Sequence, residues 1–598
     1  MAIELTDAFR LLGTPVGSAT FARTFFDDQL KATELEARRL TERIPDLQTR
    51  LKLFSQCTIH KLPHLLDADV MHNHTPEFEN DQWYNWNGYL TEGIDNIIKT
   101  FFKHLLDIPI TDEIPTYSTL IAHLNINKGG LGILNASTRA APNFVVNMMT
   151  CRRRINLGFQ QNKDITPIIL HTSIANLFNI ETNHESACLK RYHQLLPHIS
   201  SVCNGPKNNP ENSTSFFESS ISTKSARDRL KSFCGTLVTN QIHSIMETEA
   251  PDHVHLLPSI LSPQTSYPLI GTNRSNPAHR LPNWTFSIAT KRKLRLPIYS
   301  PNNKPSCKCK RDIDSFGDHW FSCRNINKTM VHNIVRDSWA TALQPALAAA
   351  GYINHSSKLD IERTNLPITE ISARPFDFSF DPDSSGPMHT PCPYTTIGFD
   401  ITITNSCVAS STNDSSGDAP SRSASADLHL QEAERKKLMR RDRKPDIDYP
   451  LGVKGEQTMH ELIVANMLLI PLTLDPHGRW GPIMENFLNL TSHNLHYQFK
   501  TNKPNAATML SKITRHPCPI GILKTADSTW KTNKTGGFFG FSYTSPTPTI
   551  FTTQQLGLGI TKAFATHIKN AEKRSSLAPA LQTAELEAQD SLSIGSFA

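Results

Sequence analysis

The sequence predicts a multidomain α+β protein, and three observations support this class. Helical periodicity with many charges runs through residues 20–57 and returns at 88–106. Two segments with the alternation of half-buried strands follow later, at 374–380 and 397–404. A length of 598 residues favours roughly three or four domains, each large enough to bury a core.

Composition limits the class of protein more than it identifies a partner. The net charge is +6, and 38% of the residues are hydrophobic. No run of about 18 apolar residues occurs, and the N-terminus lacks a secretory pattern, so we expect no membrane association. The 11 cysteines are mostly scattered, which favours reduced thiols in an intracellular protein over a disulfide framework.

The first 150 residues are expected to be helical. Leu47, Leu51 and Phe54 keep one face of the first helical region apolar. A glycine-rich turn follows at 128–133. It is not a phosphate-binding loop, because no Gly-Lys-Ser/Thr sequence follows it.

A basic cluster closes the next region, in which helices alternate with polar segments. Lys291, Arg292 and Lys293 lie together at 291–293. Such clusters suit contact with a nucleic-acid backbone, or they form the solvated end of a helix. A second basic cluster, 435–444, contains Arg440 and allows the same two interpretations.

Four soft metal ligands lie within 17 residues. They are Cys307, Cys309, His319 and Cys323, arranged around a Gly317-Asp318 turn. This donor set fits tetrahedral Zn²⁺, although chance clustering is the alternative. Four protein ligands leave no position for water, so the predicted zinc is structural, and so short a loop needs the metal to fold.

His332 begins a predicted helix at about 330–349. It is either a histidine on the helix surface or a residue that contacts nucleic acid or the following domain.

Each of the two predicted strands carries one aspartate. In the first strand, Phe376, Phe378 and Phe380 share a face and Asp377 points the other way. In the second strand, Asp400 lies opposite the apolar face, which comprises Ile397, Phe399, Ile401 and Ile403. Each strand therefore packs one face on a core and presents one carboxylate on the other.

A helix predicted at 426–441 places Lys437 on its apolar face with Ala426, Leu430 and Ala433. Two carboxylates that hold Mg²⁺, beside a lysine that orients the attacking water, can cleave a phosphodiester. The alternative is two half-buried strands with solvent-facing aspartates and a lysine whose stem covers apolar surface.

The order of these motifs resembles the C-terminal part of the reverse transcriptase polyprotein of non-LTR retrotransposons. In that array a Cys-Cys-His-Cys zinc knuckle precedes a His-Asn helix start and a restriction-like endonuclease of the PD-(D/E)xK type. The matching pieces span most of residues 10–490: 12–18, 129–132, 317–319, His332-Asn333, 374–377, 400–402, Ala433-Glu434 with Lys437, 471–472 and 478–481. Phe376 separates Pro375 from Asp377, which departs from the family's literal Pro-Asp pair.

The resemblance implies a role for each candidate residue. Asp377 and Asp400 would bind catalytic Mg²⁺, Lys437 would position water, and Glu362 would be a further acidic ligand. The implied partners are DNA and the element RNA, in the nucleus, contacted by the basic clusters and His332. The polymerase palm would lie upstream of Met1, and no Tyr-x-Asp-Asp sequence occurs, so we expect no DNA polymerisation by this chain. The alternative is a nucleic-acid-binding remnant without catalysis.

The resemblance also suggests a domain order. It comprises a thumb-like helical region (1–150), a helical linker region (151–300), the zinc knuckle (301–330), the α/β endonuclease-like core (331–495, with a disordered insertion at 406–425) and a C-terminal extension (496–598). In the extension we expect a final helix at 581–592.

Overall fold

The computed structural model describes a little under half of the chain. The described residues are 8–11, 14–17, 19–62, 83–133, 136, 223–271, 280–299, 305, 307, 309, 313–323, 328–349, 353, 358–363, 376–382, 395–404, 430, 433, 434, 467–481 and 548–576. They fall into two compact units, Met1–Ile245 and Met246–Ala598. Both helices and a small mixed sheet are present, as expected for an α+β protein. The domain boundaries suggested by the sequence remain predictions.

The first unit is mainly helical. Its elements are the hairpin β1 (Ala8–Leu11) and β2 (Thr14–Gly17), and the helices α1 (Ala19–Arg43), α2 (Leu47–Leu53), α4 (Trp83–Leu105) and α5 (Thr116–His123). Helix α10 (Thr223–Glu249) runs across the boundary between the units. The expected helical regions are confirmed. Their apolar faces meet where the rings of Phe54 and Phe101 stack at 3.7 Å.

The glycine-rich turn of this unit has a steric reason for its composition. Gly129 and Gly132 adopt positive φ angles of 78° and 70°, which favour glycine. A Cβ atom at Gly130 would overlap the backbone of Leu124. This turn is therefore a close-packed corner after α5.

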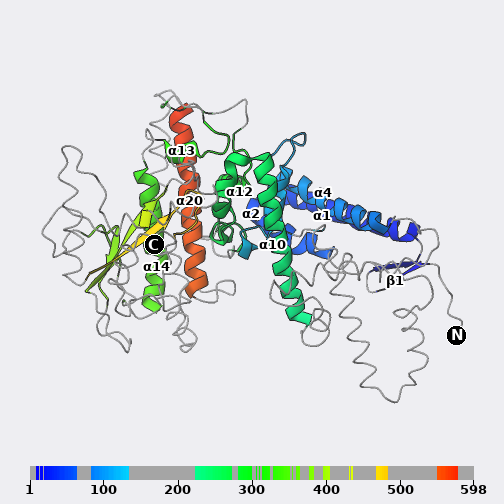
Figure 1. Cartoon of the computed structure of the whole chain (residues 1–598), viewed down its shortest axis with the longest axis horizontal. Helices are drawn as coiled ribbons and strands as arrows, with labels where there is room; N and C mark the ends of the chain where they lie inside the picture. Colours follow the sequence, from blue (N-terminus) through cyan, green and yellow to red (C-terminus); the bar gives the residue numbers. More distant parts are fainter. Residues whose placement is uncertain are drawn as a thin grey trace, which may run out of the picture. The chain divides into compact units, whose positions relative to one another are not determined.

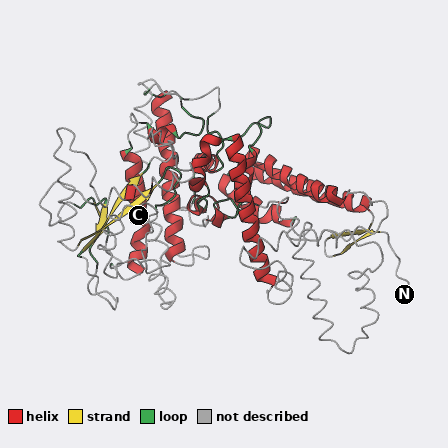
Figure 2. Cartoon of the chain, viewed as in Figure 1, coloured by secondary structure: helices red, strands yellow, loops and turns green. Residues whose placement is uncertain are grey.

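The second unit contains the sheet and the helices that cover it. In chain order they are α12 (Asn283–Lys293), α13 (His319–Ser322), α14 (Thr329–Ala349), β3 (Asp360–Ile361), β4 (Phe378–Phe380), β5 (Thr396–Ile403), β6 (Met467–Leu474) and α20 (Pro548–Ser576). Short helical turns occupy 251–271. Helices α14 and α20 lie side by side (Figure 1), and Figure 2 distinguishes these helices from the strands.

The four strands are ordered β3-β4-β5-β6. The first three run antiparallel, and β5 pairs with β6 in parallel from Thr396↔Met467 to Ile403↔Leu474. A parallel pair needs a crossover connection, usually helical. Leu430, Ala433 and Glu434 lie in this connection and are helical, which agrees with the helix predicted at 426–441.

One hydrophobic core joins the sheet to α13, α14 and α20. Phe378 stacks on Phe399 at 4.7 Å, and the fully buried Trp320 and Trp339 belong to the same cluster. Helix α20 contributes Phe564 and Ile568 to the same core. The described part of the extension 496–598 is therefore integral to this unit, whereas residues 581–592 lie outside the described residues.

The prediction that Phe376 shares a face with Phe378 and Phe380 is wrong. Phe378 and Phe380 share the Phe399 face, but a Cβ atom at Gly398 would overlap the Phe376 ring. Since Gly398 and Phe399 point to opposite faces, Phe376 lies on the other side of the sheet, which is the side of Asp400. The chain bends at Asp377 before β4 begins, and glycine leaves room for the ring.

No helix in the described part of the chain combines the length and the apolar character needed to cross a bilayer.

The contact between Phe376 and Gly398 gives a test of the fold. Alanine normally suits a strand better than glycine, but Gly398→Ala should lower the free energy of unfolding by about 1–3 kcal/mol, because its methyl group overpacks the ring. Denaturant unfolding followed by tryptophan fluorescence measures this loss. In a Phe376→Ala background the same substitution should cost much less, and an equal loss in both backgrounds would contradict the packing.

Candidate functional site

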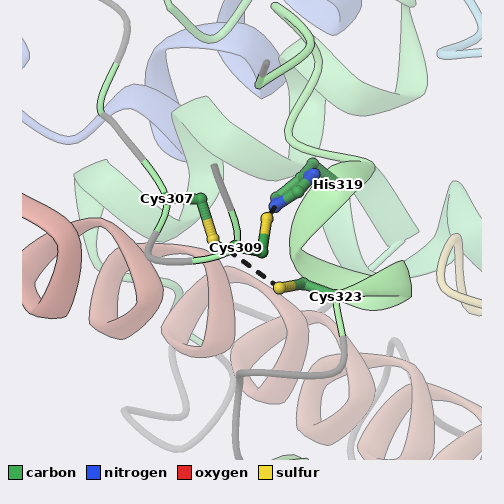
Figure 3. A group of neighbouring side chains, drawn as sticks. All are labelled: Cys307, Cys309, His319 and Cys323. Carbon is green, nitrogen blue, oxygen red and sulfur yellow. Dashed lines mark hydrogen bonds between the residues drawn. The ribbon is translucent and has the colours of Figure 1, made fainter. Parts of the chain in front are cut away.

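The four predicted zinc ligands converge in the second unit (Figure 3). His319 is the first residue of α13 and Cys323 directly follows that helix, whereas Cys307 and Cys309 come from the preceding loop. The Sγ atoms of Cys307 and Cys323 are 3.6 Å apart, and Cys309 Sγ lies 3.3 Å from His319 Nε2. All four ligand atoms lie within 4.8 Å of one another.

These spacings suit a tetrahedral metal ion. Zn–S bonds of about 2.3 Å separate two thiolate sulfurs by about 3.8 Å at the tetrahedral angle. Burial, together with hydrogen bonds among the neighbouring thiols, raises the pKa of Cys307 to about 11. A cation reverses this effect, because it stabilises the thiolate form. The cluster can therefore hold a metal such as zinc.

The helix between the last two ligands is fixed to the core of the unit. Trp320 is fully buried, and its indole N–H donates to the hydroxyl of Tyr299 at 2.8 Å. His567 of α20 donates to the backbone oxygen of Trp320 at 3.0 Å. Phe321 packs edge-on against Phe564. The helix that begins at His319 and ends before Cys323 is therefore packed into the core.

Arg292 was expected at a nucleic-acid-binding surface, but the structure buries it. It is 5% exposed, and its guanidinium lies 3.1 Å from the carboxylate of Asp318. It also donates to the backbone oxygens of Phe316 and Pro476. These contacts bind α12 to the loop that carries His319 and to the turn after β6.

Lys293 differs from its expected role in the same way. It is 3% exposed, and its ammonium donates to the backbone oxygens of Ile260 and Ser262 and to the hydroxyl of Thr265. Burial holds the pKa of Lys293 well below its usual range. Of the three basic residues only Lys291 is partly exposed. Periodicity could not separate them, because α12 packs on most of its circumference.

The first predicted catalytic aspartate directly precedes β4, and the second lies within β5, the strand that pairs with β4. The backbone N–H of Asp377 donates to the backbone oxygen of Phe399, the residue before Asp400, at 2.7 Å. Asp377 Oδ2 accepts from the backbone N–H of Ile401 at 2.5 Å. Asp400 is only 6% exposed and lies on the face covered by Phe376.

His332 projects from α14 toward Asp377, directly before β4. Its Nε2 lies 3.2 Å from Asp377 Oδ2. The hydrogen bond to Asp377 raises the pKa of His332 above its usual value, against the opposing effect of burial. Of the two proposed environments for His332, the structure favours contact with the sheet domain.

The structure describes only one of the three remaining predicted site residues. Glu362 pairs with Arg336 of α14. Lys437 and Arg440 lie outside the described residues. Glu434, whose role sequence reasoning missed, is 1% exposed and accepts from the Thr473 hydroxyl at 3.0 Å. Glu434 follows Leu430 by four residues and so lies on the same apolar face of the helix, and this spacing could have predicted its burial.

Among the described residues, the cysteine–histidine cluster is the only place where three or more potential metal ligands lie close together.

No protein-family model matches the chain, and a search of curated proteins gives no match.

Metal analysis tests the cluster directly. Purified protein should contain about one zinc ion per chain, and Cys323→Ser or His319→Asn should lose it, because three ligands hold the ion much more weakly. Cys57→Ser is the matched control, since Cys57 is exposed and lies in the other unit. Elemental analysis after gel filtration gives the stoichiometry. Equal zinc in all variants would contradict the assignment.

Proposed function

We propose that this chain is the C-terminal portion of a non-LTR retrotransposon reverse transcriptase polyprotein, without the polymerase palm, and that it nicks target DNA with Mg²⁺. The proposal depends mainly on one observation. Asp377 bonds to the backbone of Phe399 and Ile401, the two residues on either side of Asp400 in β5, within a chain that carries the zinc-ligand cluster and His332 in the family's order.

Each residue has a defined role in this hypothesis. Asp377 and Asp400 would hold Mg²⁺, which supplies charge stabilisation at the phosphate when bound. Lys437 would orient water, and Glu362 would need to leave Arg336 to act as a further ligand. His332 would hold one oxygen of Asp377 in place. Zinc would be structural, and the partners would be DNA and element RNA in the nucleus.

The second candidate is a nucleic-acid-binding protein that does not cleave. Specific contacts favour it. Asp400 is buried, Phe376 covers the same face, and both Asp377 and Glu362 bind cationic or N–H groups of the protein. This candidate would bind DNA with a strong salt dependence and leave it intact.

Plasmid nicking distinguishes the two candidates. With Mg²⁺, the wild type should convert supercoiled plasmid to open circles, and Asp400→Ala should be slower by about 100-fold, because one ligand of the charge-stabilising ion is lost. Asp337→Ala removes an exposed carboxylate on α14 and should nick like the wild type.

The control for metal dependence is the same assay with excess chelator, which should stop nicking. Equal nicking by wild type and Asp400→Ala would refute the assignment. DNA retention at low salt without cleavage by any variant would establish the second candidate.

A further inference from the structure

The loop between Cys309 and His319 is organised by Asp314. Its Oδ1 accepts from the backbone N–H groups of Phe316 and Asp318 at 2.9 and 3.0 Å. Its Oδ2 accepts from the N–H of His319 at 2.6 Å. One carboxylate therefore binds three N–H groups of the segment that ends at a metal ligand.

These bonds close a tight turn. Gly317 lies within it at a φ of 75°, a conformation that other residues rarely adopt. The hydrogen bond to the His319 N–H fixes the backbone from which the imidazole projects toward Cys309. Hydrogen bonds from backbone N–H groups to a charged carboxylate are stronger than those between neutral groups.

A second carboxylate holds the same turn from outside. Asp318 lies between Arg295 and Arg292, at 2.6 and 3.1 Å. The two guanidinium groups also lie over aromatic rings of the loop and of α13, Arg295 over Phe316 and Arg292 over Phe321. All three charged side chains are almost completely buried. The end of α12 thus fixes the position of the residue directly before His319.

We propose that Asp314 is a positioning residue of the metal centre, which restrains the loop so that less ordering remains when His319 meets the three cysteines. A ligand loop that is already ordered loses less conformational entropy when the ion binds. Groups that orient metal ligands in this way typically change metal affinity by about 10–100-fold when they are removed. Asp314 is a better probe than Asp318, because removing Asp318 would leave two buried guanidinium groups without their carboxylate.

The experiment is a zinc competition titration of the full-length protein against a chromogenic chelator. Asp314→Ala should bind zinc about 10–100-fold more weakly than the wild type. Asp314→Asn keeps one acceptor oxygen but loses the bond to the His319 N–H, so its affinity should fall between the two. Asp337→Asn is the matched control, with a side chain that is 59% exposed, and it should bind zinc like the wild type.

Circular dichroism at saturating zinc separates positioning from folding. Recovery of the wild-type spectrum by Asp314→Asn, together with weakened binding, supports the proposal. Wild-type affinity in both Asp314 variants would overturn it. A spectrum that stays unfolded at saturating zinc would also overturn it, since Asp314 would then support the fold whether or not metal is bound. The titration contains no DNA, so its result is independent of whether the chain cleaves.

Discussion

The second unit depends on the convergence of four metal ligands around one buried tryptophan. Cys307 and Cys309 approach from the loop, while His319 and Cys323 flank α13, whose Trp320 is fully buried in the common core. The ligand loop supplies little apolar surface of its own, so a metal bound there would replace the packing that a longer segment would provide. Tyr299 and His567 connect that tryptophan to residues before the cluster and to α20.

This convergence explains why basic residues lie in the interior. Arg292 and Arg295 stabilise Asp318 beside a metal ligand, and burial of charges at this density is tolerated only when they are paired. Burial raises the pKa of the Asp318 carboxyl, but the two guanidinium groups outweigh it and hold that pKa well below its usual range. In the sequence, Arg292 suggests contact with nucleic acid. In the structure, its side chain instead stabilises the loop that precedes His319.

Part of this arrangement could be predicted from residue types and spacing. Soft ligands at close spacing identify a metal cluster, and alternation over 397–404 identifies β5. The missed elements depend on distant partners. Helix α20 contains Gly557 and Gly559, which disfavour helix formation, but at Gly559 a side chain would collide with Ser338 of α14. The position of Gly559 requires glycine because the two helices approach closely there. The local sequence does not reveal this approach.

The acidic residues beside β4 and within β5 show the same limit. Alternation predicts that Asp400 lies opposite Phe399, but it cannot predict that Phe376 crosses to the Asp400 face over Gly398. Nor can it place His332, more than 40 residues before Asp377 in the chain, beside that carboxylate. Whether a metal ion can reach Asp377 and Asp400 depends on these tertiary contacts.

Hydrogen exchange with and without metal tests most directly whether the cluster supports the core. Removing the metal with a chelator should increase exchange at backbone amides of both α14 and α20, because α13 and the ligand loop would no longer be fixed against them. Amides of α1 and α4, in the other unit, serve as the internal reference and should keep their protection. Unchanged protection of α14 and α20 after confirmed metal removal would contradict the account.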